Sequence, residues 1–438
     1  MLLERFVDTR PLLASPAFRR LWIGSTAAGF SGQLVATAVL YQVWELTRSP
    51  WWTGAIGLAT AAPTIIGGLI GGTLADTIDR CRLVLATTAV TVIAAAGLAA
   101  QAGLDTASVF LVLTLVMAQT AATALGAAAR RTFIARLLPT GLVPAGVALN
   151  HVSFQIAMLA GPALAGVILA TGGLRAAYLA DALGITVSLY GVLRLPSMRP
   201  HPSSSTAPST APSTAPSPAS GTAPGRGMLA GLRATGQGWR YLASRPELRG
   251  CLATDLAATG LAMPIALFPA VNDERFGGSE YTFGLFASAV AVGGLLAGLA
   301  SGTITRASGA GRLMLAASAT WGSALAVFAL VNSLPATLAC LAVAGAADTV
   351  AVICRGAIVQ VSTPDAYLGR VSAAENIVGV AGPGLGNARA GAVAGATSAA
   401  TSTLTGGLAC VVVVAFIAAA TPALRRWRQP AAAGTAFT

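Results

Sequence analysis

Long apolar runs follow one another along almost the whole chain, and short polar segments separate them. Each run is roughly 20 residues long, which suits a helix that crosses a hydrocarbon layer of ~30 Å. Strands of a membrane barrel would instead alternate apolar and polar residues. The pattern therefore predicts an all-α integral membrane protein. We expect twelve transmembrane helices, over residues 21–45, 53–74, 83–102, 107–128, 146–170, 177–195, 248–271, 283–304, 313–331, 336–354, 371–395 and 402–422.

One segment near the middle of the chain breaks this pattern. It contains "STAPSTAPSTAPSPAS" (205–220), which has no large apolar side chain and cannot bury a core. Next comes "GLRATGQGWRYLASRPELRG" (231–250), whose arginines and aromatic residues are typical of a helix at the membrane surface. We expect a six-helix half at 1–195, a cytoplasmic linker at 196–245 and a second six-helix half at 246–438.

The two halves share short stretches of sequence. "GTITRASGAGR" (302–312) aligns without gaps on "GTLADTIDRCR" (72–82), and "RGAIVQVSTP" (355–364) aligns on "RRTFIARLLP" (130–139). The first two stretches follow the second span of their halves, and the other two follow the fourth span of their halves. The halves are therefore predicted to be pseudo-repeats, an arrangement typical of transporters that work by alternating access.

Charge is scarce and one-sided. Only 10% of the 438 residues are charged, against about 25% in soluble domains. All 27 basic residues are arginine, and a cytoplasmic N-terminus would place 23 of them on the cytoplasmic side. The other four are Arg48, Arg175, Arg275 and Arg389. This positive-inside asymmetry explains the net charge of +12 without a nucleic-acid partner. We expect a multi-pass protein of the bacterial inner membrane with both termini cytoplasmic.

Several kinds of chemistry are excluded by composition. Without lysine the chain can carry neither a Walker A phosphate loop nor a lysine Schiff base. The five cysteines are scattered, show no metal-ligand spacing and read as small apolar side chains. There is no serine nucleophile motif, and only two histidines are present. We expect no metal site, no cofactor and no enzymatic activity.

The loop after the second span carries a motif. "GGTLADTIDRCR" (71–82) resembles the loop signature G-x-L-a-D-x-x-x-R-x-R/K of the major facilitator superfamily. The pieces "PAFRRLW", "YQVWELTRS" and "VQVSTPDAYLGRVSAAENI" resemble the enterobactin-exporter branch of that superfamily. The resemblance extends along nearly the whole chain. It implies the major facilitator fold and a transport function, but the loop signature says nothing of the substrate.

The same resemblance implies a conformational latch. In the family, the loop aspartate joins the two halves on the cytoplasmic side together with an arginine of the fourth helix. A carboxylate is stabilised at a helix N-terminus, and the N-terminus of the eleventh span is the expected neighbour of Asp76. The alternative is a solvated charge cluster that only sets topology. The latch candidates are Gly72, Asp76, Arg80, Arg130 and Arg131.

The fifth span contains "MLAGPALAGVIL". Gly161, Pro162 and Gly166 resemble the G-P-x-x-G-G signature of facilitator antiporters, with Ala165 in place of one glycine. Proline inside a helix removes a backbone hydrogen bond and bends the helix. The resemblance implies export, and the alternative is an ordinary packing kink, since glycine and proline are common in membrane helices.

Acidic residues inside the spans are candidates for proton coupling, because such residues are costly in a membrane and are usually functional. A carboxylate in water stays ionised near neutral pH, so a proton carrier has to be partly buried. Asp255 is the first candidate, and Glu375, Asp348 and Asp181 follow. An ion pair between Asp348 and Arg355, seven residues on, would keep Asp348 charged. For each acid the alternative is a hydrogen bond between helices.

Polar and aromatic side chains of the first and fifth spans are the candidate substrate contacts: Gln33, Tyr41, Phe30, Asn150, Phe154 and Gln155. We expect a monomeric, proton-coupled exporter in the lipid bilayer that carries an amphipathic small molecule, either a catecholate-type siderophore or a drug-like compound. An importer of the same fold is the first alternative. A non-transporting receptor or membrane enzyme is the second.

Overall fold

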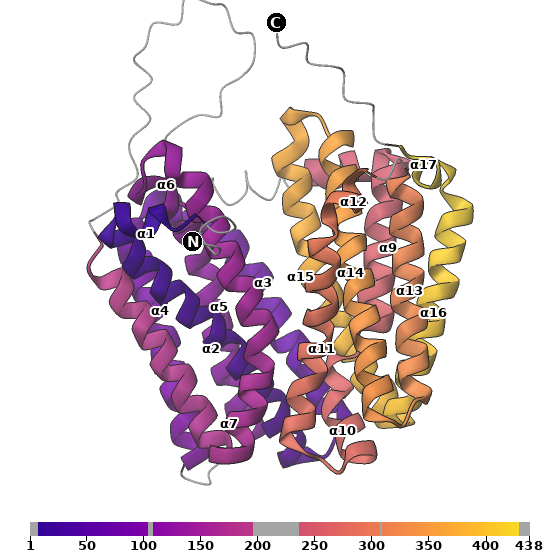
Figure 1. The fold of residues 1–438 in the computed structure, drawn as a ribbon, viewed down its shortest axis with the longest axis horizontal. Helices are drawn as coiled ribbons and strands as arrows, with labels where there is room; N and C mark the ends of the chain where they lie inside the picture. The colour runs from indigo at the N-terminus through magenta and orange to yellow at the C-terminus, as the bar shows by residue number, and fades with distance from the viewer. Residues whose placement is uncertain (1–7, 104–107, 196–235, 307–308, 429–438) are drawn as a thin grey trace, which may run out of the picture.

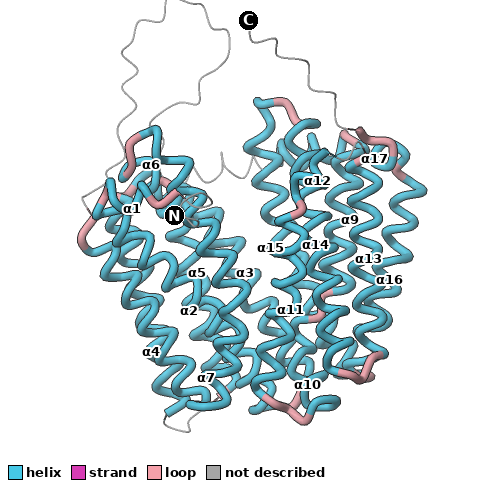
Figure 2. Tube along the Cα trace, viewed as in Figure 1, coloured by secondary structure: helices cyan, strands magenta, loops and turns pink. Residues whose placement is uncertain are grey.

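The computed structural model describes residues 8–103, 108–195, 236–306 and 309–428, and this part of the chain contains helices and no strand (Figures 1 and 2). The helices form two groups that stand side by side. The first group comprises α1 (Arg10–Ala14), α2 (Pro16–Thr47), α3 (Pro50–Thr77), α4 (Arg80–Gly103), α5 (Val109–Arg131), α6 (Phe133–Leu137), the 3-10 turn η2 (Thr140–Leu142) and α7 (Val143–Leu193). The second group comprises α9 (Pro246–Ala262), η3 (Ile265–Leu267), α10 (Phe268–Phe276), α11 (Glu280–Leu299), α12 (Ser301–Arg306), α13 (Ala310–Leu330), α14 (Leu334–Ser362), α15 (Asp365–Ala396), α16 (Ala399–Ala420) and α17 (Pro422–Arg425).

The long helix α7 crosses the bundle twice. The first part of α7 runs parallel to α2, since Ala157 faces Gly29 and Gly161 faces Gln33. The second part runs antiparallel to α2, since Gly184 faces Ser31 and Gly191 faces Arg20. The chain reverses at Gly173, whose φ of 70° lies in the left-handed region open to glycine. The fifth and sixth expected spans are therefore both present.

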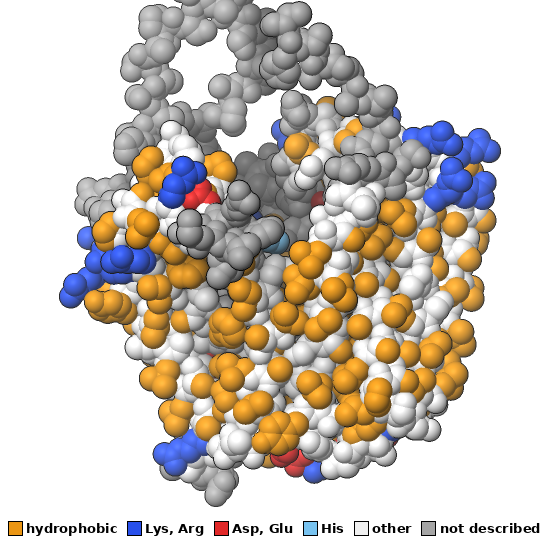
Figure 3. Space-filling view, viewed as in Figure 1, with side chains coloured by type: hydrophobic (Ala, Val, Ile, Leu, Met, Phe, Trp, Pro, Cys, Tyr) orange, Lys and Arg blue, Asp and Glu red, His pale blue; other side chains and the backbone are white. Residues whose placement is uncertain are grey.

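The described residues include ten segments long and apolar enough to span a membrane. One of them, Thr140–Leu193, contains the two crossings of α7. The helix α15 is long enough to cross as well, although Glu375 and Arg389 lie within it and it is not among the ten. Together they give the twelve expected crossings. On the face shown in Figure 3, apolar side chains are spread over both halves, and clusters of basic side chains lie toward the two ends of the bundle.

The seventh span differs from the expected continuous helix. The helix α9 ends at Ala262, and the 3-10 turn η3 and the short helix α10 follow. Pro264 has no N–H group and cannot continue the helix. The Asn387 side chain of α15 accepts a hydrogen bond from the freed Ala266 N–H at 3.0 Å. The break therefore costs no unpaired donor there, and it brings η3 against the centre of the protein.

The part of the expected surface segment that the structure describes is helical over residues 236–244. Its Tyr241 ring stacks on Tyr367 of α15, with 4.7 Å between ring centroids. The Tyr241 hydroxyl also donates to the carbonyl of Ser362 at 3.3 Å. This helix is thus attached to the second half. The Ser/Thr/Ala/Pro-rich stretch lies outside the described residues.

The two ends of the bundle differ in how closely the halves approach. We call the end with α1, α6 and α17 the terminal end, and the opposite end, with α10, the far end (Figure 1). At the far end α3 meets α15, where a Cβ on Gly57 would lie 2.7 Å from the carbonyl oxygen of Gly384. There α7 also meets α11, where a Cβ on Gly166 would lie 3.1 Å from the Gly284 Cα. Only glycine permits such close backbone contact.

Two side-chain contacts add to the far-end closure. Arg48 Nη1 lies 2.9 Å from Asp273 Oδ2, and the Tyr41 hydroxyl donates to Glu280 Oε1 at 3.0 Å. Each contact joins α2 to the second half. Tyr41 was predicted to contact the substrate, but its hydroxyl instead joins the two halves through Glu280.

The halves are separated at the terminal end. No described atom comes within 4 Å of a Cβ built on Gly68 or Gly72 of α3, or on Gly379 of α15. The visible surface is hollowed between the halves at this end (Figure 3). The same two helices therefore touch at one end of the bundle and diverge toward the other.

Candidate transport site

A cavity of about 720 Å³ lies between the halves, on the side of the far-end contact that faces the terminal end. The first half supplies most of its wall, from α2, α3, α4, α5 and the second part of α7. The second half contributes Ile265 and Ala266 of η3 and Asn387 of α15, so the break in the seventh span forms part of the site. Arg130 and Asp181 are the charged residues of the lining.

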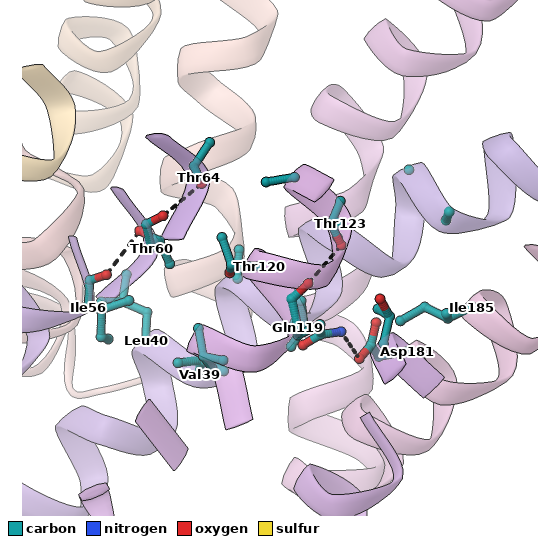
Figure 4. A pocket seen from close by; sticks show the side chains of 18 of the residues that line it. Val39, Leu40, Ile56, Thr60, Thr64, Gln119, Thr120, Thr123, Asp181 and Ile185 are labelled. Atoms are coloured by element: carbon teal, nitrogen blue, oxygen red, sulfur yellow. Dashed lines mark hydrogen bonds between the residues drawn. The ribbon is translucent and has the colours of Figure 1, made fainter. Parts of the chain in front are cut away.

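Threonines supply much of the polar surface of this cavity. Thr60 donates its hydroxyl proton to the Ile56 carbonyl at 3.0 Å, and Thr64 donates to the Thr60 carbonyl at 2.7 Å (Figure 4). Thr123 does the same toward Gln119 at 2.8 Å. Such bonds to the preceding turn satisfy hydroxyl groups in apolar helices. The lone pairs of these hydroxyl oxygens remain as hydrogen-bond acceptors in the cavity wall.

Asp181 lies in the cavity wall opposite Gln119. Its Oδ2 accepts a hydrogen bond from Gln119 Nε2 at 3.1 Å (Figure 4). Its Oδ1 is buried and has no partner within the described structure. The residue as a whole is 0% exposed. A buried carboxylate oxygen without a partner is costly.

Arg130, a latch candidate, belongs to the cavity in this conformation. Its guanidinium donates to Thr88 Oγ1 at 2.5 Å and to Ser188 Oγ at 3.3 Å. Its neighbour Arg131 is exposed. Arg80 donates to the Ala75 carbonyl at 3.1 Å, beside the end of α3. The Asp76 side chain lies outside the described part of the structure, so the latch stays a prediction.

A second charged cluster lies within the other half. Arg355 of α14 forms an ion pair with Asp255 of α9 and another with Glu375 of α15, the latter at 3.1 Å. The exposed fractions of these side chains are 12% for Arg355, 9% for Asp255 and 23% for Glu375. None of the three lines the central cavity.

The expected ion pair between Arg355 and Asp348 is wrong. Arg355 turns to α9 and α15, and the described residues give Asp348 no ion pair. The sequence spacing considered only one helix, whereas three helices meet at Arg355. Two of the four candidate acids, Asp255 and Glu375, thus share one arginine. Asp181 lies apart from them, in the first half.

The six candidate substrate contacts do not line the central cavity. Asn150 and Phe154 line a second cavity of about 190 Å³ together with Ser25 and Ser153. Gln33 instead lies 2.8 Å from the Met158 sulfur. The central cavity is lined instead by polar residues that were not predicted from the sequence: Gln119, Thr60, Thr64, Thr88, Thr91 and Thr123. Their spacing of three or four residues within uncharged spans was the available signal.

The Gly161, Pro162 and Gly166 signature lies at the contact between the halves. Pro162 lies inside α7, and the non-helical residue of that helix is Gly173. A Cβ on Gly284 of α11 would lie 2.6 Å from the Pro162 carbonyl oxygen. The signature therefore provides a close crossing of α7 and α11 at the far end.

Solved structures share this arrangement of helices. The chain superposes on a variant of the nucleoside transporter NupG with a TM-score of 0.70 at 14% identity, covering 92% of this chain and 99% of that chain. It also superposes on a bacterial homologue of the human lysosomal transporter Spinster with a TM-score of 0.65 at 16% identity, covering 95% and 98%. At these identities the likeness establishes the fold alone. The chain therefore shares the fold of these transporters, with its cavity between two groups of helices.

Sequence comparison identifies the family. The profile described as "Transmembrane secretion effector" matches residues 9–215 and 218–436, and the chain belongs to this family of transporters. It is 26% identical over 420 residues to the enterobactin exporter EntS of Citrobacter koseri, covering 96% of this chain and 95% of the relative. It is 26% identical over 421 residues to EntS of Shigella flexneri, covering 95% of each.

Proposed function

We propose that the chain is a proton-driven exporter of an amphipathic small molecule, a siderophore or a drug-like compound. The observation that carries this proposal is the cavity of about 720 Å³ enclosed between the halves and lined from both. Ligand sites of secondary transporters lie at such a repeat interface. The full-length relation to proteins named enterobactin exporters favours export as the direction.

The terminal end faces the cytoplasm in this proposal, because the positive-inside distribution of arginines favours that orientation. The closed far end and the open terminal end then correspond to an inward-facing conformation. A structural neighbour, the bacterial Spinster homologue, is described as inward-facing and unoccupied. Substrate would enter from the cytoplasm, and rocking of the halves would open the far end.

Proton coupling is assigned to the cluster around Arg355. Two carboxylates, Asp255 and Glu375, share a single guanidinium, so one negative charge is left over when both are ionised. Charges held in low dielectric are stable only when well paired. A proton taken up by the pair would neutralise this excess and loosen the contact between α9, α14 and α15. The inward-directed proton gradient would thereby change how these helices pack.

The test uses inverted membrane vesicles from cells that contain the protein and a panel of labelled siderophores and drug-like compounds. Acidifying the lumen should drive accumulation of the transported compound if the protein is an exporter. Asp255→Asn should abolish this accumulation, and Glu375→Gln should reduce it. Efflux from the lumen under the same gradient would instead identify an importer. An unchanged distribution of every compound would favour a receptor. The panel is chosen by finding which compound accumulates in cells that lack the protein.

A further inference from the structure

Many polar side chains that line the central cavity can accept a hydrogen bond from a ligand but cannot donate one. Six threonines of its lining donate their hydroxyl protons to backbone carbonyls of their own helices: Thr53, Thr60, Thr64, Thr88, Thr91 and Thr123. A hydroxyl group has one proton and two lone pairs. Each of these oxygens can therefore only accept a further hydrogen bond. Thr88 already accepts one from Arg130, and Thr53 and Thr91 are buried. Thr60, Thr64 and Thr123 are at least partly exposed, and their hydroxyl oxygens are left for a ligand.

Asp181 adds the strongest acceptor to the same wall. Gln119 occupies only Oδ2, at 3.1 Å, and Oδ1 has no partner among the described residues. Arg130, which could have neutralised it, is bound to Thr88 and Ser188. No other carboxylate lines the cavity. Asp181 is 0% exposed in this conformation, so a ligand group reaches Oδ1 only when the side chains beside it in the wall move aside.

We propose that this wall is a binding subsite for ligands rich in O–H or N–H donors, with Asp181 Oδ1 as the central acceptor. The inference rests on the proposed function, in that it takes the cavity as the transport site, and it adds the chemistry of the substrate. An ether or a tertiary amine of the same shape would leave the acceptors unpaired. Because an unsatisfied buried acceptor is costly, donor-poor molecules are rejected. Phenols and protonated primary amines both meet this requirement.

The experiment measures ligand binding to the detergent-solubilised protein, without any gradient. Two matched pairs separate the two sources of donors. The first pair is a bis(dihydroxybenzamide) and its fully O-methylated ether. The second is a primary alkylammonium ion and its N-trimethylated analogue, which keeps the charge but has no N–H. The donor-bearing member of at least one pair should bind about tenfold or more tightly than its methylated partner. Equal affinities within both pairs would overturn the proposal.

Variants then locate the acceptor. Asp181→Asn, whose amide oxygen can satisfy Gln119, presents N–H groups in place of Oδ1. It should weaken binding of the donor-bearing probe about tenfold and leave the methylated probe within about twofold. Thr64→Val should weaken the same probe about threefold. The matched controls are Glu247→Gln, in the first turn of α9, and Thr186→Val, whose hydroxyl makes the same kind of backbone bond on an exposed position.

The outcomes separate this inference from the proposed function. Donor-selective binding that survives Asp181→Asn would overturn the role of Asp181, whatever the transport direction. Donor-selective binding that Asp181→Asn removes, together with failed proton-driven accumulation in vesicles, would overturn the proposed function and leave the subsite intact. If Asp181→Asn does not fold, binding to Asp181→Ser supplies the second readout. Its shorter side chain removes Oδ1, so donor selectivity should fall about tenfold, and unchanged donor selectivity would overturn the role of Asp181.

Discussion

The two halves of the protein differ in how they hold their buried carboxylates. In the first half Asp181 lies in a cavity wall rich in threonines, and no basic side chain of the described residues pairs with it. In the second half Arg355 pairs with both Asp255 and Glu375, and Asp255 Oδ2 is buried without a hydrogen-bond partner among the described residues. An acceptor without a basic partner is suited to a changing ligand. An ion cluster with one excess carboxylate is suited to switching between protonation states.

This difference suggests that the two halves have different roles in transport. The first half would provide the surface that selects the substrate, and the second would respond to the proton. The coupling between them would pass through η3 and α15, since Ile265, Ala266 and Asn387 reach the cavity from the second half. The Arg355 cluster is connected to both elements, because its Asp255 lies on α9, which leads into η3, and its Glu375 lies on α15.

The largest effect is expected for Arg355→Ala. Removing the shared partner leaves two buried carboxylates uncompensated, which costs about 3–5 kcal/mol for a buried pair. We expect a marked fall in thermal stability in detergent and complete loss of transport. Arg48→Ala is the control, because the Arg48 pair is half exposed, with exposed fractions of 51% and 38%, and surface pairs contribute about 0–1 kcal/mol. Equal stability of the two variants would show that the cluster is not a buried switch.

The next effect concerns the contact at the far end. In the double variant Gly166→Ala/Gly284→Ala, new methyl groups would meet backbone atoms across the two halves, at 2.7 Å from the Glu280 carbonyl oxygen in the first case. The far end could then no longer close, and we expect transport to fall about tenfold or more. Gly395→Ala is the control, since its nearest atom is 3.8 Å away. Spin labels on the two halves at the far end should report a larger separation in the double variant, and an unchanged distance would count against this contact as a gate.

Asp76→Asn should have a smaller effect. The loop motif implies that Asp76 stabilises the outward-facing state at a helix N-terminus, an interaction of about 0.3–1 kcal/mol and up to ~2 kcal/mol when partly buried. We expect a loss of transport of about threefold to thirtyfold without a change in thermal stability. Substrate efflux from cells with matched protein levels checks this. Normal efflux would show that the aspartate only sets topology.

Deleting residues 203–220 should have the smallest effect. The stretch lacks any large apolar side chain that could dock on either half. The remaining linker residues can still join the halves as flexible chain. Efflux should stay within about twofold of the wild type. If the deletion variant reaches the membrane but is inactive, the repeat itself has a binding role in transport, and the two halves alone do not account for the activity.

Much of the fold could be predicted from the sequence, because spans of ~20 residues and the asymmetry of the arginines reflect the bilayer itself. The break at Pro264 could have been suspected from the proline alone. The hydrogen bond from the Ala266 N–H to Asn387 could not, because these two residues lie 121 positions apart.

The site was harder to predict than the fold. Asp181 and Arg130 were recognised as functional candidates, yet their common cavity depends on how α5 and α7 pack. Arg355 was assigned to Asp348 because spacing on one helix was the only geometry available. The ion cluster that forms instead joins α9, α14 and α15, which no local pattern in the chain could reveal.

The most direct test compares Asp255→Asn with Asp181→Asn in one experiment on detergent-solubilised protein. Binding of the transported compound and the release of protons into a weakly buffered solution are measured together. We expect Asp255→Asn to bind the compound but to release no proton. We expect Asp181→Asn to lose most of its binding, while any compound that does bind still causes proton release. Wild-type proton release from Asp255→Asn would contradict the different roles of the two halves, and Glu375, Asp348 and Asp181 would then be the acids to test.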